Sequence, residues 1–157
     1  MILTDQEGTG HMVLTPTYHV FEMYTPFQEA TYLPLDLESE TIQCSKEYFK
    51  EKAKTSDNTT RPCPLLSASA AKTVDGSLVL AVTNVSLDKD QTIDFDIQGY
   101  AAKQVSGRIL TSKNVADYND FKSPNVVAPK DYKDAKIKKG ILTVKVPAKS
   151  IVVLNIK

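Results

Sequence analysis

The sequence contains no tryptophan, only two cysteines and no long apolar run, and each absence narrows what the protein can be. A membrane-spanning helix needs about 20 mostly apolar residues, so nothing in the chain is expected to span a bilayer. The opening residues MILTD have no basic segment and no apolar core, so we expect no signal peptide there. The 19 basic and 19 acidic residues cancel, which gives no electrostatic reason to expect nucleic acid or membrane binding.

The two cysteines, Cys44 and Cys63, do not form a metal-binding motif. Their spacing is not CxxC, and the two histidines, His11 and His19, are remote from them in sequence. A structural zinc site is therefore not expected, and no cofactor is indicated. The pair could close a disulfide loop or remain two thiols, and the sequence leaves both alternatives open.

One short helix is indicated near the start of the chain. Thr15 can serve as the N-cap and Pro16 suits the first helical position, where its missing N–H costs nothing. Pro26 is expected to end the helix. Its apolar residues predict one large aromatic face, formed by Val20, Phe21, Tyr24 and Phe27. A helix of two to three turns is marginal alone and needs a packing partner.

From Pro64 onward the pattern is that of β-strands. Apolar residues occupy both faces in segments 78–83 and 150–156, which predicts central strands covered on both sides. Residues 92–97 and 141–146 alternate, which predicts strands with one buried face. Pro34 makes segment 30–38 an edge strand or two pieces meeting at a bend, and Gly107 suggests a bulge. Seven or eight such strands with turn signals such as Asp75-Gly76 predict a mainly β fold, an antiparallel, jelly-roll-like β-sandwich after one short α-helix.

Two segments do not follow this pattern. Residues 45–61 are charged and polar, with one possible helical turn, and they end in a polar loop at 55–60. Residues 113–129 form a long connection, of the kind that often crosses between the sheets of a sandwich.

Several phrases of the sequence resemble the C-terminal part of glycoside hydrolase family 51 α-L-arabinofuranosidases. They span the chain in the family's order, and residues 45–61 read as an insertion. The phrases are MILTD (1–5), MVLTPTYHVFEMY (12–24), ATYLPLDLE (30–38), PLLSASAAK (64–72), LAVTNVSLDKDQ (80–91), VSGRILTS (105–112) and VPAKSIVVLNI (146–156).

The resemblance implies a two-domain parent, a (β/α)8 barrel followed by a β-sandwich. Residues 1–28 would be the tail of the barrel with its last helix, and residues 29–157 the C-terminal sandwich. The barrel-contact residues would be Tyr18, Val20, Phe21, Tyr24 and Phe27. The helix face would then lack its partner in this chain. The sandwich, which in the family recruits the extreme N-terminus, would be incomplete, with an exposed edge that favours association into an oligomer.

The resemblance also implies the chemistry of the parent. Retaining hydrolysis needs two carboxyl groups about 5 to 5.5 Å apart, and the family places both glutamates in the barrel. No catalytic, cofactor-binding or metal residue is therefore assigned here. Glu22 and Glu38 are the nearest candidates, but an ion pair or cap is the better interpretation of Glu22. His19 reads as structural, and Asp94, Asp96 and Glu40 read as solvated carboxylates.

Two functions follow from this. The first is the non-catalytic C-terminal domain of an α-L-arabinofuranosidase acting on terminal groups of arabinan or arabinoxylan, with the barrel as partner; this segment alone would be inactive. A periplasmic or extracellular parent is favoured, although a cytoplasmic one is compatible. The alternative is a free-standing carbohydrate-binding β-sandwich, whose sugar platform would use Tyr100, Tyr118, Phe121 and Tyr132. The first function predicts an aromatic helix that is unsupported or buried against a neighbouring molecule. The second predicts coplanar exposed rings on one sheet face, with the helix packed on its own domain.

Overall fold

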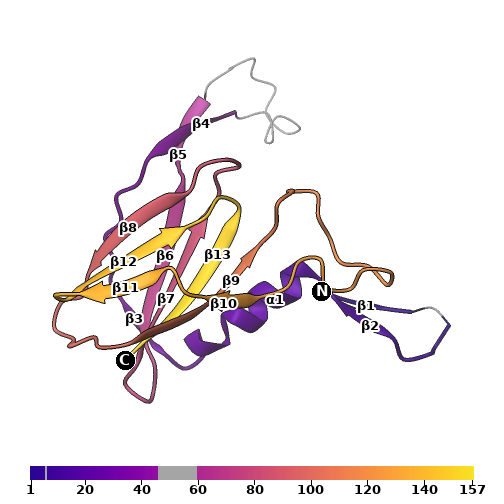
Figure 1. Cartoon of the computed structure of the whole chain (residues 1–157), viewed down its shortest axis with the longest axis horizontal. Coiled ribbons are helices and arrows are strands. Elements are labelled where there is room, and N and C mark those ends of the chain that lie inside the picture. The colour runs from indigo at the N-terminus through magenta and orange to yellow at the C-terminus, as the bar shows by residue number, and fades with distance from the viewer. Residues whose placement is uncertain (6, 46–59) are drawn as a thin grey trace, which may run out of the picture.

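The computed structural model describes residues 1–5, 7–45 and 60–157, and it shows an antiparallel β-sandwich with one α-helix near the N-terminus (Figure 1). The proposed insertion and polar loop fall largely on residues 46–59, outside the described residues. The elements are β1 (Ile2–Thr4), β2 (Met12–Leu14), α1 (Pro16–Met23), the 3₁₀ turn η1 (Thr25–Phe27), β3 (Thr31–Leu33), β4 (Thr41–Ser45), β5 (Thr60–Pro64), β6 (Leu66–Lys72), β7 (Leu78–Asn84), β8 (Gln91–Asp96), β9 (Val105–Thr111), β10 (Lys130–Tyr132), β11 (Ala135–Lys138), β12 (Ile141–Val146) and β13 (Ser150–Ile156).

Two sheets form the sandwich. The larger has six strands in the order β10-β9-β13-β7-β6-β3, and the smaller has three in the order β11-β12-β8. The predicted fold class is confirmed. β10 and β11 were not predicted, because strands of only three and four residues are too short to give a periodic signal. Pro34 leaves β3 as an edge strand. Two hairpins, β1-β2 and β4-β5, extend away from the sandwich (Figure 1).

The main core lies between the two sheets. Its fully buried residues come from the inward positions of β7, β12 and β13, and the alternating residues of β8 pack against them. The innermost side chains are Val82, Leu142, Val144, Val146, Val152 and Leu154, each with a relative exposure of 0%. The inward faces predicted for segments 92–97 and 141–146 are thus confirmed.

β7 and β13 pair along seven residues at the centre of the larger sheet. Their other faces belong to a second core, which includes Val79, Ala81 and Val153. Both strands are therefore covered on both sides, as their unbroken apolar sequences predict.

Helix α1 lies on the outer face of the six-stranded sheet and completes this second core. Met23 is buried beside Ala81, Leu110 and Val153, and Val20, Tyr24 and Phe27 pack on the same cluster. The expectation of a helix without support in this chain is therefore wrong. Buried His19 and Met23, four residues apart, define the face of the helix turned to the sheet.

The predicted start of α1 is confirmed. Thr15 Oγ1 accepts a hydrogen bond from Tyr18 N at 3.4 Å, and Pro16 occupies the first turn. The same hydroxyl donates to Met1 O at 2.7 Å and so ties hairpin β1-β2 to the helix. Just before Pro26, the α-helix gives way to the 3₁₀ turn η1.

Gly107 does not form a bulge, since β9 pairs with β13 in continuous register. A Cβ atom there would lie 2.4 Å from Leu154 Cδ2 and 2.9 Å from Val153 O. The glycine instead provides space for Leu154 and the Tyr132 ring, which pack on either side of it.

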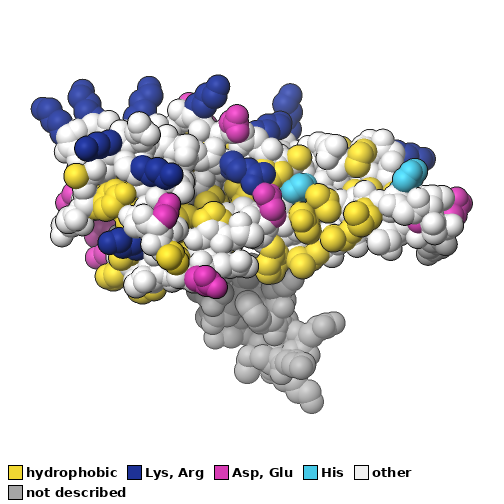
Figure 2. All heavy atoms as spheres, turned by 90° about the horizontal axis from the view of Figure 1, so that it is seen from below, with side chains coloured by type: hydrophobic (Ala, Val, Ile, Leu, Met, Phe, Trp, Pro, Cys, Tyr) yellow, Lys and Arg dark blue, Asp and Glu magenta, His cyan; other side chains and the backbone are white. Residues whose placement is uncertain are grey.

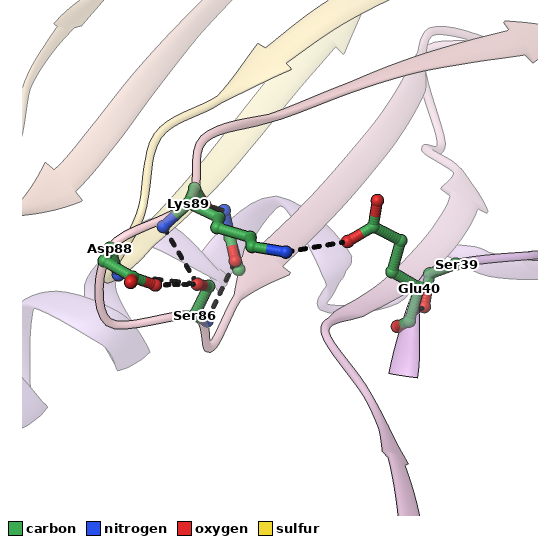
Figure 3. A network of polar contacts seen from close by, with 6 residues as sticks. Ser39, Glu40, Ser86, Asp88 and Lys89 are labelled. Carbon is green, nitrogen blue, oxygen red and sulfur yellow. Dashed lines mark hydrogen bonds and ion pairs between the residues drawn. The ribbon is translucent and has the colours of Figure 1, made fainter. Parts of the chain in front are cut away.

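The connection between β7 and β8 is held by side chains of its own (Figure 3). Asn84, 1% exposed, donates through Nδ2 to Lys89 O at 2.8 Å and to Val146 O at 3.0 Å. The Lys89 ammonium lies 3.7 Å from the Glu40 carboxylate, which joins this loop to the start of β4. Glu40 is thus an exposed ion-pair partner, in agreement with its interpretation from the sequence.

Cys44 and Cys63 lie in the β4-β5 hairpin and are not joined by a disulfide. Cys44 is opposite Arg61 and Cys63 is opposite Ile42, so the two cysteines are diagonal neighbours across the ladder. Diagonal positions are about 7 to 8 Å apart, longer than the usual Cα separation in a disulfide.

Replacing Gly107 with alanine should destabilise the chain by about 1–3 kcal/mol, because the new methyl group would displace Leu154 or the backbone of β13. Urea unfolding measures this change. The neighbouring exposed Ser106→Ala is the control and should change the free energy of unfolding by less than about 0.5 kcal/mol. Equal stability of the two variants would contradict the packing argument.

Met23→Ala should cost about 2–5 kcal/mol, because Met23 is buried between α1 and the sheet. Phe21→Ala is the matched control on the same helix. It should have little effect in this chain, because Phe21 is 63% exposed. Similar losses for both variants, measured by urea unfolding, would mean that α1 does not pack on the sheet in this orientation.

Candidate functional site

Glu22 and Glu38, the two carboxylates considered for catalysis, do not form a pair in the described structure, and Asp94, interpreted as a solvated carboxylate, is separate from both. Glu22 lies on α1, where it forms an ion pair with Arg108 of β9. Glu38 is exposed in the segment between β3 and β4. Asp94 accepts a hydrogen bond from Thr143 Oγ1 at 2.5 Å on the outer surface of the smaller sheet. These positions support the ion-pair interpretation of Glu22 and assign none of the three a catalytic role.

A metal centre is likewise absent from the described residues, where no three His, Cys, Asp or Glu side chains come together. His19 is 8% exposed, and its Nε2 receives no hydrogen bond and donates none among the described residues. It packs edge-on to Tyr18 at 5.8 Å between ring centroids. The described part of the chain also has no helix long and apolar enough to cross a membrane.

The four aromatic residues considered as a sugar platform do not form one. Tyr132 is 7% exposed. Its hydroxyl lies within hydrogen-bond distance of two backbone carbonyl oxygens, Asp134 O at 2.8 Å and Lys145 O. Burial, together with the nearby Asp134 charge, raises the pKa of Tyr132 to about 12. Tyr100 packs against the main core. Only Tyr118 and Phe121 are exposed, at 66% and 48%.

An exposed apolar surface lies instead at the N-terminal end of the molecule, over hairpin β1-β2 and α1 (Figure 2). We call it the N-terminal apolar face. Phe21, 63% exposed, lies on the side of α1 opposite buried His19 and Met23. The residues of this face are Met1 (62%), Ile2 (44%), Leu3 (40%), Met12 (65%) and Phe21. Ile2 and Met12 lie on one side of hairpin β1-β2 and Leu3 on the other, because successive strand residues point to opposite sides. Exposed apolar side chains gathered on neighbouring elements mark an interaction surface more often than single scattered ones do.

The connection 113–129 is fastened beside this face. Asn119, 2% exposed, donates through Nδ2 to Leu14 O and to Val127 O, both at 2.8 Å. Its Oδ1 accepts from Val127 N at 2.8 Å, and Val127 is buried in the second core with Met23. The connection joins β9 and β10, neighbours in one sheet, so the expectation that it crosses between sheets is wrong. Sequence periodicity could not predict the hydrogen bonds of Asn119, because Leu14 is remote from it in sequence.

The five residues proposed to contact the barrel fall into two groups, those that pack on the sheet of this chain and those that do not. Val20, Tyr24 and Phe27 pack wholly or partly on the sheet of this chain, and the Tyr24 and Phe27 rings stack at 5.3 Å. Phe21 points away from the sheet, and Tyr18 is partly exposed on the flank of the helix. A hydrophobic face that appears continuous in sequence is therefore divided between two sides of α1.

Comparison with known proteins agrees with this architecture. The family model for the α-L-arabinofuranosidase C-terminal domain matches residues 1–150. An intracellular exo-α-L-arabinofuranosidase from Bacteroides ovatus is 44% identical over all 157 residues. The solved GH51 arabinofuranosidase of Xanthomonas axonopodis pv. citri is 36% identical, with a TM-score of 0.85 over 100% of the chain.

The fold also matches that of the GH51 α-L-arabinofuranosidase of Thermotoga petrophila, with a TM-score of 0.73 at 22% sequence identity. This match covers 99% of this chain and 31% of the Thermotoga chain. The chain spans 27% of the Bacteroides ovatus protein and 28% of the Xanthomonas protein. In these relatives the domain is thus attached to a much longer chain. The chain therefore belongs to the C-terminal domain family of glycoside hydrolase family 51 α-L-arabinofuranosidases.

Proposed function

We propose that this chain is the non-catalytic C-terminal part of an α-L-arabinofuranosidase that removes terminal α-L-arabinofuranosyl groups from arabinan or arabinoxylan. The parent retains configuration by means of two glutamates that lie outside these 157 residues. The relatives' length supports this proposal, since the chain spans 27% of the Bacteroides ovatus enzyme. The separate positions of Glu22, Glu38 and Asp94 also support it.

Within the parent, residues 1–28 are the tail of the catalytic barrel and residues 29–157 the sandwich that supports it. The observation that carries this proposal is the double-sided helix. Met23 binds α1 to the sheet, while Phe21 on the opposite side remains 63% exposed. The N-terminal apolar face, which includes Phe21, packs against the rest of the barrel. Tyr18, Val20, Tyr24 and Phe27 then fix the helix between the two domains.

The smaller sheet also has room for a partner strand. β8 is paired with β12 only, among the strands described, and its inward residues Ile93 and Phe95 are partly rather than fully buried. The extreme N-terminus of the parent joins this edge, as the resemblance implies. Without it, the open edge favours association between copies of the isolated chain.

The carbohydrate-binding alternative based on an aromatic platform receives less support. A platform needs several exposed rings on one face, whereas Tyr132 is buried and Tyr100 packs on the main core. The helix does pack on its own domain, as that alternative predicts, but this packing is equally compatible with a helix held between two domains.

The 157-residue chain should not release 4-nitrophenol from 4-nitrophenyl α-L-arabinofuranoside, whereas a version extended upstream through the barrel should. The physical reason is that the acid/base and nucleophile carboxylates are supplied by the barrel. Circular dichroism of the short chain serves as the folding control. Clear activity in the folded short chain would overturn the proposal and direct attention to Glu22 and Glu38.

Phe21→Asp should destabilise the extended enzyme by at least about 1.5–3 kcal/mol, the gain from burying a large apolar side chain, yet leave the short chain nearly unchanged. Thermal unfolding of both lengths measures the difference. Val74→Asp is the matched control, because Val74 is 82% exposed and lies in the β6-β7 turn and not on α1. If Phe21→Asp behaves like Val74→Asp in the extended enzyme, this face does not contact the barrel.

A further inference from the structure

A groove of about 350 Å³ lies between the C-terminal end of α1 and the outer face of the six-stranded sheet. Its wall comes from the last turn of α1 and from η1, and its floor comes from β7, β9, β10 and β13. The floor residues are Val79, Ser106, Arg108, Asp131, Val153 and Asn155.

The strand register explains how these side chains meet. Asn155 is opposite Val79 on one side and Ser106 on the other. In the next row on the same face, Arg108 is opposite Val153 and Asp131. Directly opposite residues have Cβ atoms about 4.5–5.5 Å apart, so the two rows form a continuous floor.

Asn155 is the unusual member of this floor. β13 is otherwise apolar at nearly every position between Ile151 and Ile156, yet here it carries a carboxamide. The Asn155 Oδ1 is buried and receives no hydrogen bond from the described residues. Leaving such an acceptor without a donor costs roughly 1–3 kcal/mol, so this oxygen calls for a donor other than the described residues.

The charges around Asn155 indicate which donor fits. Arg108 is neutralised by its ion pair with Glu22 across the groove, so it gives little attraction for an anion. Asp131 and Ser106 are exposed and offer a carboxylate acceptor and a hydroxyl. Met23, Val79 and Val153 add apolar surface between these polar groups. Hydroxyl groups carried on a C–H framework match this mixture, because they donate to Asp131 and, once the Asn155 carboxamide turns toward the groove that it lines, to Oδ1. The C–H groups then cover the apolar residues.

We propose that this groove is a binding site for a neutral polyhydroxylated ring of monosaccharide size, held by Asn155, Ser106 and Asp131. The site is distinct from the N-terminal apolar face. Glu22 lies on the flank of α1 that borders the groove, whereas Phe21 lies on the side turned away from the sheet.

Titration of the ¹⁵N-labelled 157-residue chain with L-arabinose, followed by heteronuclear NMR, tests the proposal. The choice of L-arabinose as the first sugar rests on the proposed function, so D-xylose and D-glucose are titrated in parallel. We expect saturable shifts of the Asn155 side-chain amide and of the Ser106 and Arg108 backbone amides. A small ligand with a few hydrogen bonds should give a Kd on the order of millimolar.

Asn155→Leu should weaken sugar binding at least about tenfold, because it removes the amide at nearly constant volume. The same substitution should preserve or raise the thermal stability of the chain, since it removes a buried acceptor without a donor. Ser67→Ala, an exposed position on β6 that does not line the groove, is the control and should bind as the original chain does.

Three outcomes would overturn the proposal. The first is that no sugar produces a saturable NMR shift. The second is that the folded Asn155→Leu variant binds the sugar as tightly as the original chain does. The third is that methylammonium chloride shifts these signals whereas the sugars do not. The last would identify a cation site created by Asp131. Each of these outcomes leaves the activity of the extended enzyme untouched, so failure of the groove is distinguishable from failure of the proposed function.

Discussion

The pairing of β7 with β13 is the interaction on which the rest of this structure depends. The two strands pair over seven residues, and both are apolar on both faces. One face forms the core with the smaller sheet, and the other receives α1. Because a strand pair of this kind cannot leave either face in water, it requires a layer on each side. The three-layer arrangement of small sheet, large sheet and helix follows from that requirement.

In the proposed parent enzyme, this arrangement gives α1 a role in connecting the two domains. Met23 anchors the helix on the sheet, the Glu22–Arg108 pair holds one flank, and Asn119 holds the chain that leads into it. An ion pair this exposed contributes little to stability, about 0.2–1 kcal/mol, so the apolar contact supplies most of the attachment. A helix fixed in this way can transmit the position of the sandwich to whatever packs on Phe21, and the same fixation shapes the groove beside Glu22.

Much of the sandwich could be predicted from local pattern. The alternation of Ile93 and Phe95 and the apolar runs around Val82 and Val153 correspond to the strands found, because a strand's two faces differ at every second residue. The Thr15-Pro16 start of the helix depends only on neighbouring backbone groups, so it too could be read locally. The family resemblance gave the relation to arabinofuranosidases, which no pattern of burial could have supplied.

Contacts between distant segments determined the remainder. The sequence by itself determined which segments become strands and where the helix begins, because those choices rest on period and capping within a few residues. Only the tertiary structure decided that Met23 rather than Phe21 faces the sheet, that Gly107 makes room for Leu154, and that Asn155 lies in a groove beneath α1. Each of these outcomes depends on a partner tens of residues away, and local periodicity carries no information about which surface that partner presents.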